Sequence, residues 1–313
     1  MTTMSKKRFM GIGAFKHKLD KVRIIFFQGN SFSTQRSYEL GESCAMFGNA
    51  HFDVLKKTVF YIHGYMEGPN HESVNVIVDS YLQRNDHNIL VLDWSQLANG
   101  NYLIDAVPNA KQLATKLSEV VLDWIDEGLD VNRFHVIGHA LGGQIAGMIG
   151  RCAFRKSEGE TKLTRITALD PISVFPLGAR INEKDAHMVD FIFTDAWFYS
   201  NPKDSGTLKF WPSSPLRKSK SSSDDARIHG RAWKLWAETV QPSGQPIFLS
   251  VYAKGLNDFK KGRVDNSEIV PMGIDCPMSA KKGDYFLQIN ANKPFAKGIR
   301  GLKYERDRIK AHV

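Results

Sequence analysis

The sequence of 313 residues has little cysteine and no long apolar run, and each shortage excludes a class of protein. Its three cysteines, Cys44, Cys152 and Cys276, are widely separated and form no CxxC pair. This spacing fits a reduced compartment or a single optional bridge better than a disulfide framework. No stretch approaches about 20 consecutive apolar residues, so no transmembrane helix is expected. Metal-ligand spacings such as HExxH are also missing, so we expect no metal site and no cofactor.

The basic N-terminal segment, residues 1–31, lacks the apolar core that a secretory signal needs. Its two apolar runs, FMGIGAF and VRIIFF, are short, and lysine and arginine residues lie between them. Together with the few cysteines, this favours a cytoplasmic protein, an expectation that a start site further upstream would reverse.

What the sequence does contain is the composition of a folded protein, with 42% apolar, 24% charged and 11% aromatic residues. The net charge of +9 is concentrated in residues 214–227 and 297–313. Such an excess would suit a polyanion or an anionic membrane surface. Because no nucleic-acid-binding motif accompanies it, we expect a well-solvated basic surface and no nucleic-acid partner, with an anionic membrane surface as the alternative.

Short apolar runs alternate with amphipathic segments from residue 58 to about residue 195. This pattern predicts a mostly parallel sheet covered by helices on both faces, which is an α/β fold. The expected strands are residues 58–64, 88–94, 134–138 and 164–170, and the expected helices are residues 72–85, 109–127 and 141–152.

Beyond residue 200 the pattern weakens into a loop rich in proline and serine, followed by one helix over residues 231–240. The sequence contains no internal repeats and no linker long enough to divide two domains. We therefore expect a single domain over residues 20–298, with a basic N-terminal extension (1–19) and a basic C-terminal tail (299–313).

The segment HVIGHALGGQIAG, residues 135–147, has the layout of a turn that presents a nucleophile. In the pattern G-x-S-x-G the serine occupies a sharp turn between a strand and a helix, and the flanking glycines give room for it. Gly138 and Gly142 fit the glycine positions, but Ala140 stands where the serine is expected. A methyl group cannot act as a nucleophile.

Several blocks of the chain, in order from about Phe52 to Gly298, resemble the pancreatic-lipase family, which includes phospholipases A1 and lipase-like yolk proteins. The blocks that carry the resemblance are FYIHGYMEG, VLDWSQLANGNYLIDAVPNAKQLATKLSEVV, GHALGGQIAGMIGR, ALDPISVFP and IHGRAWKLWAETV. The resemblance implies an α/β-hydrolase fold with a mostly parallel central sheet and helices on both faces.

The resemblance also implies the roles of individual residues. Asp170 matches the acid and His229 the base of a catalytic triad, in the chain order of the α/β hydrolases. Ala140 occupies the position of the nucleophilic serine. The backbone N–H groups of Tyr65 and Leu141 would form the oxyanion hole, which stabilises the charge that develops on the ester oxygen.

The chain departs from the family pattern at other positions too. The family's HTD triplet begins here with Phe193, and the family's usual cysteines around the lid are absent. The interval between residues 170 and 229 leaves room only for a short lid, which is similar to the phospholipase A1 branch. Residues 214–227, in the lid region, are polar, and the chain stops before any C-terminal β-sandwich.

Three hypotheses follow. The first is a natural pseudoenzyme, a lipase fold kept for binding or storage, with a cleft near Tyr65, Leu141 and Ile172 for a lipid or fatty-acyl ester. The second is an active triacylglycerol lipase or phospholipase A1, a carboxylic ester hydrolase of lipid catabolism, whose serine was replaced deliberately to trap substrate. The third is an esterase with residual or unconventional activity. The wider departures favour the first, although the family is mostly secreted and this chain shows no leader.

Overall fold

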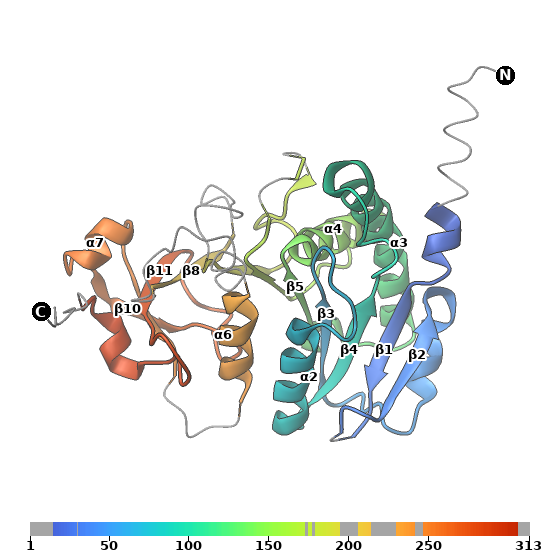
Figure 1. Cartoon of the computed structure of the whole chain (residues 1–313), viewed down its shortest axis with the longest axis horizontal. Helices are drawn as coiled ribbons and strands as arrows, with labels where there is room; N and C mark the ends of the chain where they lie inside the picture. Colours follow the sequence, from blue (N-terminus) through green and yellow to red (C-terminus); the bar gives the residue numbers. More distant parts are fainter. Residues whose placement is uncertain are drawn as a thin grey trace, which may run out of the picture.

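In the computed structural model the described residues are 15–29, 31–172, 175–176, 179–194, 206–213, 230–241 and 247–305. Figure 1 shows an elongated molecule built on one eleven-stranded sheet, with strand order β10-β9-β11-β8-β7-β6-β5-β3-β4-β1-β2. The strands are β1 (Arg23–Phe27), β2 (Gln35–Glu39), β3 (Lys57–Ile62), β4 (His87–Asp93), β5 (Phe134–His139), β6 (Arg165–Leu169), β7 (Met188–Ile192), β8 (Leu208–Ser213), β9 (Leu249–Tyr252), β10 (Asp265–Pro271) and β11 (Gly283–Gln288).

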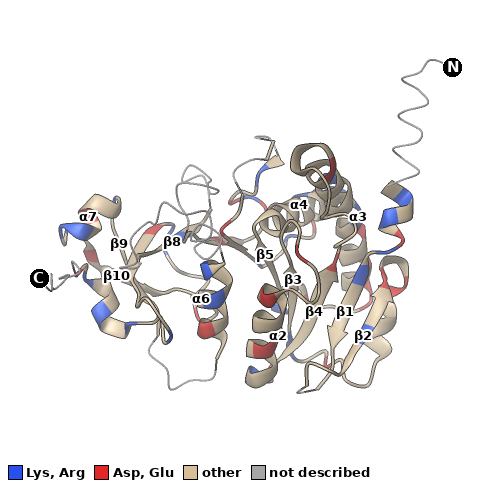
Figure 2. Ribbon diagram, viewed as in Figure 1, with Lys and Arg blue, Asp and Glu red and all other residues tan. Residues whose placement is uncertain are grey.

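The centre of the sheet is parallel, from β4 through β3, β5, β6, β7 and β8 to β11. The strands at its middle, such as β3 and β4, are nearly continuous apolar runs, as expected of parallel strands that helices cover on both faces. In Figure 2 the middle strands β3 and β5 carry almost no charged residues. The predicted α/β-hydrolase class, a mostly parallel sheet with helices on both faces, is confirmed.

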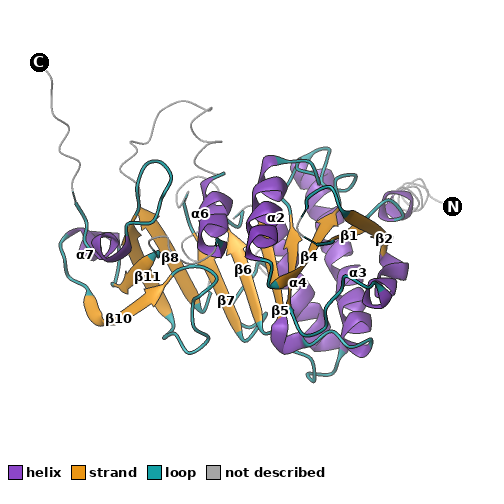
Figure 3. Cartoon of the chain, turned by 90° about the horizontal axis from the view of Figure 1, so that it is seen from below, coloured by secondary structure: helices purple, strands orange, loops and turns teal. Residues whose placement is uncertain are grey.

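The helices divide into two layers, one on each face of the sheet (Figure 3). On one face, α3 and α4 pack with strand residues such as Phe60 and Val136. On the other face, α2 and α6 pack with Tyr61 and Ile137, the alternate residues of the same strands. The main helices are α2 (Glu72–Arg84), α3 (Val107–Asp126), α4 (Leu141–Lys156), α6 (Arg231–Val240) and the short α7 (Leu256–Lys260).

The predicted helices and strands begin and end within about two residues of the observed ones, except that α4 continues to Lys156, four residues past its predicted end. The parallel strand β7 was not predicted, and the expectation of a loop and a single helix beyond residue 200 was wrong. Strands β8, β9, β10 and β11 complete the sheet there, and β1 and β2 form its other edge. The pairs β1–β2, β1–β4, β9–β11 and β9–β10 are antiparallel. Edge strands such as β2 expose most of their side chains, so they lack the apolar run that identified the central strands.

Both ends of the described chain pack against the domain. Phe15 and Leu19 contact the core on the α3–α4 face. At the other end, residues of the 3-10 helix η5 (Gly298–Leu302) and the following Tyr304 pack beside Phe259 and Phe286. The predicted limits of the domain, which separate residues 20–298 from the N-terminal extension and the C-terminal tail, stay predictions.

The three cysteines are unbridged, two of them buried and Cys44 partly exposed. Burial raises the pKa of the Cys276 thiol to about 12, with a further contribution from Asp190, so this thiol is held in its unreactive form. Among the helices in the described ranges, none combines the length and apolarity that crossing a bilayer requires.

Candidate functional site

Three neighbouring strands of the parallel sheet, β3, β5 and β6, end at the same edge. Ile62 pairs with Gly138, and His139 pairs with Leu169, so the loops that follow these strands start side by side. The predicted residues Tyr65, Ala140 and Asp170 each lie within three residues of the end of one of these strands. The sheet therefore gathers them at one place, as parallel topology requires.

Ala140 occupies the tip of the turn between β5 and α4. Its backbone has φ 51° and ψ −114°, a conformation that residues with a side chain rarely adopt. Its N–H donates to the carbonyl of Leu169 at 2.9 Å, and its carbonyl accepts from the N–H of Ile172 at 3.4 Å. Ala140 is 3% exposed. The turn is thus a strained strand-to-helix elbow, fixed to the loop after β6, and its tip has no side-chain oxygen.

The two glycines that flank the tip allow α4 to lie against the sheet. A Cβ on Gly138 would stand 2.2 Å from the carbonyl oxygen of Gly142, and a Cβ on Gly142 would stand 2.2 Å from that of Ile62. Both distances are far inside van der Waals contact, and the obstacles are backbone atoms. Only glycine fits these two positions without moving the elbow.

The loop after β3 is anchored by His63. Its ring is fully buried and stacks on Trp94 with centroids 5.6 Å apart, while the Trp94 indole N–H donates to the His63 carbonyl at 3.0 Å. Burial lowers the pKa of His63, which therefore stays neutral, with Nδ1 donating to the Gly64 carbonyl at 3.0 Å. A neutral, stacked histidine fixes the start of the loop.

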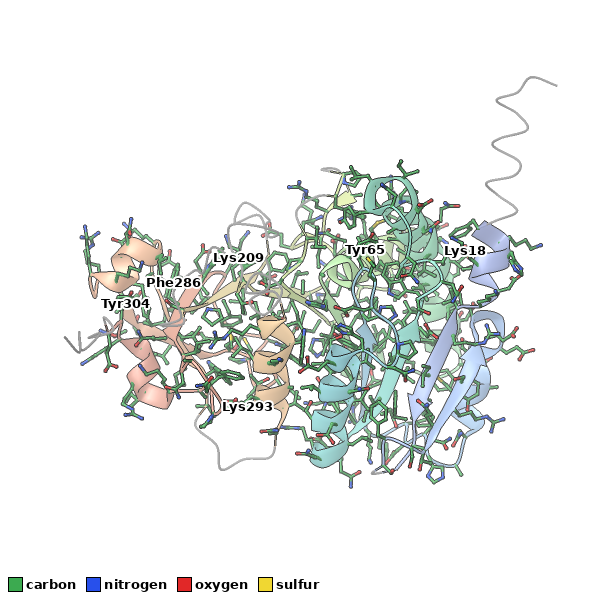
Figure 4. The ribbon with its side chains drawn as sticks, viewed as in Figure 1. Lys18, Tyr65, Lys209, Phe286, Lys293 and Tyr304 are labelled. Atoms are coloured by element: carbon green, nitrogen blue, oxygen red, sulfur yellow. The ribbon has the colours of Figure 1, made fainter. Side chains whose placement is uncertain are left out.

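Tyr65 and Met66, further along this loop, contact the segment that precedes α3. The Tyr65 hydroxyl donates to the Gly100 carbonyl at 2.5 Å, and its ring meets that of Tyr102 edge-to-face at 5.2 Å. The N–H of Met66 donates to the Ala98 carbonyl at 3.0 Å. Figure 4 labels Tyr65 in the same region as α4. The side chain of Tyr65 is thus engaged with a neighbouring segment, so a role in an oxyanion hole would rest with its backbone N–H.

Leu141 is the first residue of α4, where a backbone N–H has no acceptor within its own helix. The elbow and the β3 loop also approach each other closely. A Cβ on Gly64 would stand 3.2 Å from the Cβ of Ala140 and 3.1 Å from Oε1 of Glu67. The segments that carry the N–H groups of Tyr65 and Leu141 are therefore in contact around the tip.

Asp170 follows β6 and is completely buried. Its backbone N–H donates to the Ile192 carbonyl at 2.9 Å, and its carboxylate accepts from both the N–H of Thr194, at 2.6 Å, and the Thr194 hydroxyl. Thr194 is the middle residue of the triplet that begins with Phe193, and sequence reasoning did not identify it. The Phe193 ring stacks on Trp211, with centroids 4.6 Å apart.

Glu67 is the second residue that sequence reasoning missed. Its carboxylate Oε1 lies 2.7 Å from Nδ1 of His139, and these side chains are 9% and 2% exposed. Burial by itself would raise the pKa of Glu67, but the charge and hydrogen bond of His139 and the N–H of Gly64 outweigh it and lower the pKa well below its usual range. Its sequence signal is slight, a single acid within a glycine-rich loop.

Backbone strain is concentrated at this edge of the sheet. Of the five described non-glycine residues with positive φ, three are Met66, Ala140 and Asp170, at 57°, 51° and 43°. They follow β3, β5 and β6 respectively. Strained residues persist where the surrounding structure holds them, and they cluster at functional sites. Strain at three adjoining loops therefore identifies this edge as the candidate site.

His229, the predicted base, and residues 214–227, the predicted lid region, lie outside the described residues. Gly230, the next described residue, directly precedes α6. The start of α6 is fixed by Arg231, whose guanidinium donates to the carbonyls of Asn290 and Ala291 at 2.7 and 3.0 Å. In the described part of the chain, no group of three or more histidine, cysteine, aspartate or glutamate side chains is arranged to hold a metal ion.

Comparison with known proteins places this geometry in context. The Lipase family model matches residues 3–206. Lipase member H-A from Xenopus laevis is 29% identical over 170 residues, which cover 53% of this chain and 36% of that protein. Vitellogenin-3 from Drosophila melanogaster is 28% identical over 183 residues, which cover 57% of this chain and 43% of that protein. The matched region thus spans less than half the length of these relatives.

Among solved structures, a phospholipase/carboxylesterase from Dyadobacter fermentans aligns with a TM-score of 0.33 and 12% identity. That alignment covers 58% of this chain and 79% of the other.

Proposed function

This chain belongs to the Lipase family, and we propose that it is a pseudoenzyme that binds a lipid or a fatty-acyl ester without forming an acyl-enzyme. In this proposal Ala140 holds the nucleophile position, Asp170 is the acid and His229 the base. The backbone N–H groups of Tyr65 and Leu141 form the oxyanion hole. The observation that carries the proposal is the strained elbow with a methyl group at its tip.

The chemistry explains why one missing oxygen matters. In this type of site a serine hydroxyl attacks the ester carbon, the histidine takes its proton, and the acid fixes the histidine's orientation. Without the hydroxyl, the oxyanion hole and substrate binding alone leave about 10³–10⁴-fold catalysis over water, far below a working enzyme. The chain is therefore expected to hold an ester without cleaving it at a useful rate.

Binding does not depend on the missing hydroxyl, because the affinity for an acyl chain comes from apolar burial. Ile172, which is 9% exposed, donates its N–H to the Ala140 carbonyl, and Leu141 starts the helix on the other side of the tip. We propose that these residues and Tyr65 line the cleft for the acyl chain.

A second candidate function is an active lipase or phospholipase A1 whose serine has been replaced. The observation that favours it is the preserved geometry around Asp170, whose carboxylate accepts two hydrogen bonds from Thr194. The strained conformation of Ala140 is also retained. An esterase with residual activity is the third reading. Ester turnover by the unaltered chain separates the third reading from the first two, and a serine codon at position 140 in the source genome would favour a replaced serine over a natural pseudoenzyme.

We also propose that an anionic lipid surface is a partner. Met66, Leu103 and Ile104 are 67%, 62% and 74% exposed, and they lie in the two segments joined by the contact of Tyr65 with Tyr102. Exposed apolar side chains beside the site could enter a lipid surface, and the net charge of +9 would favour an anionic one.

Mass spectrometry of lipid that co-purifies with the protein, together with displacement of a fluorescent fatty acid, tests the binding proposal. Ile172→Asp should abolish displaceable binding, because it places a charge in the cleft. Ile299→Asp is the matched control, since Ile299 is 75% exposed and lies in η5. Equal binding by the two folded variants would contradict the proposed cleft.

A further inference from the structure

A buried acid–base pair joins the two segments that carry the proposed oxyanion donors. Glu67 lies two residues after Tyr65 in the β3 loop, and His139 lies two residues before Leu141 at the elbow. Their side chains meet with Oε1 and Nδ1 2.7 Å apart. Glu67 is therefore linked to the N–H of Tyr65, and His139 to that of Leu141, through only two residues of backbone.

The carboxylate of Glu67 also organises its own loop. Its second oxygen, Oε2, accepts from the N–H of Gly64 at 2.9 Å and from the hydroxyl of Ser73, in the first turn of α2, at 2.8 Å. Nδ1 of His71 stands 3.7 Å from the same oxygen. One buried carboxylate thus contacts the β3 loop, the start of α2 and the elbow.

Nothing in the chemistry of a lipase-type triad uses this pair, yet it adjoins the reacting position. A Cβ on Gly64 would lie between Oε1 of Glu67 and Cβ of Ala140, at 3.1 and 3.2 Å from them. A buried pair is retained at a cost in desolvation, and fixing a unique arrangement is one reason for retaining it. Here the arrangement that it fixes is the spacing between the loop and the elbow.

We propose that Glu67 is a positioning residue which, through His139, sets the distance between the N–H groups of Tyr65 and Leu141. The inference rests on the proposed function, because it takes those two groups as the oxyanion donors. It predicts that the pair controls how well the site stabilises a developing oxyanion and has little effect on how tightly the acyl chain binds.

The test uses the Ala140→Ser variant as parent and a p-nitrophenyl alkylphosphonate as probe. The serine oxygen would bond to phosphorus as the bond to p-nitrophenolate breaks, with the hydroxyl proton passing to His229. Glu67→Gln and His139→Asn should each lower the maximal phosphonylation rate by about tenfold to a hundredfold, with an unchanged half-saturating concentration. The double variant should be no slower than the slower single variant.

Asp190→Asn is the matched control. It removes one partner of another buried pair in the same sheet, in which Arg165 lies 2.9 Å from Asp190, and it should leave the phosphonylation rate unchanged. If Glu67→Gln does not fold, Glu67→Asp, which keeps the charge but shortens the reach, is compared with His139→Asn in the same way. Parental rates in the folded variants, or losses that multiply in the double variant, would overturn the proposal.

A parent that does not react at all would contradict the proposed triad, and the pair is then tested separately by hydrogen exchange in the unaltered chain. Glu67→Gln should speed exchange of the amides of residues 64–66 by about tenfold and leave those of residues 59–62 unchanged. Unchanged exchange at residues 64–66 would refute the positioning role.

Discussion

At the scale of single residues, the elbow combines strain with close packing. The positive φ of Ala140 and the absence of side chains at Gly138 and Gly142 are parts of one arrangement, in which α4 starts almost in contact with β3 and β5. Strain of this kind costs on the order of 1–3 kcal/mol per residue, so the surrounding contacts must hold it. The chain has kept the strained turn although its tip carries no hydroxyl.

Gly138→Ala should destabilise the protein by more than about 4 kcal/mol or prevent folding, because its Cβ would lie 2.2 Å from the carbonyl oxygen of Gly142. Chemical denaturation of the variant and the unaltered chain measures the difference. Gly41→Ala is the control, since nothing lies within 4 Å of its Cβ, and it should change stability by no more than about 1 kcal/mol. Similar effects of the two substitutions would argue against the packing described for the elbow.

The sequence predicted the turn at the elbow, but it did not predict which side chains contact the residues around it. The motif around Gly138 and Gly142 predicted a tight turn because glycine spacing is a local property. The contact of Glu67 with His139 joins residues 72 positions apart, and no local pattern indicates it. Thr194 was missed for the same reason, since its link to Asp170 depends on the pairing of β6 with β7.

At the scale of elements, the loop after β3 connects the sheet to α2 and to the elbow through one ionised carboxylate. His139 and His71 are basic side chains beside Glu67, and His63 of the same loop also interacts with its charge. The N–H of Gly64 and the hydroxyl of Ser73 donate to it. Their combined effect keeps the pKa of Glu67 below its usual range in spite of burial. The stability of this junction must therefore depend on pH.

A lowered folded-state pKa means that Glu67 contributes stability above its unfolded-state pKa, near 4.5, and loses it as the pH falls toward the folded-state value. At pH 7, Glu67→Gln should lower the free energy of unfolding by about 3–5 kcal/mol, because it leaves His139 without its charged partner. The difference between the two proteins should shrink below about pH 4.5. Urea denaturation at several pH values measures it, and a difference independent of pH would contradict the ionised pair.

The elements themselves were predicted unevenly. Helices α2, α3 and α4 and strands β3 to β6 follow from apolar periodicity, because each buries a continuous stripe or run. The strands after residue 200 escaped prediction since they are short and partly exposed. β8, for example, alternates buried and half-buried residues and contains Pro212. Antiparallel pairing at both edges also depends on distant segments, which a local pattern cannot reveal.

At the scale of the whole molecule, the carboxyl ends of the parallel strands lie at one edge of the sheet and their amino ends at the opposite edge. The candidate site lies at the carboxyl ends of β3, β5 and β6, together with the exposed Leu103 and Ile104 of the π-helical turn η2 (Tyr102–Ala106). Val54 and Leu55, which are equally apolar and 57% and 76% exposed, lie just before β3 begins, at the opposite end of that strand. Val54 and Leu55 therefore serve as a control for the proposed contact of Leu103 and Ile104 with lipid.

Replacing both Leu103 and Ile104 by serine should weaken binding to anionic phospholipid vesicles by about tenfold, because two apolar side chains leave the lipid. Replacing Val54 and Leu55 by serine should not. Binding of the unaltered chain should also weaken as salt rises, since the screening length falls from about 10 Å at 0.1 M to about 3 Å at 1 M. Vesicle co-sedimentation measures all three, and equal losses in the two double variants would exclude this face as the contact.

The most direct test of the central claim is the turnover of a short-chain p-nitrophenyl ester by the unaltered chain, by Ala140→Ser and by Ala140→Ser with His229→Ala. The account predicts no burst and no enzyme-like turnover by the unaltered chain, a gain of about 10²-fold or more in Ala140→Ser, and loss of that gain in the double variant. Enzyme-like hydrolysis by the purified, unaltered chain, with Ala140 verified by mass spectrometry, would contradict it.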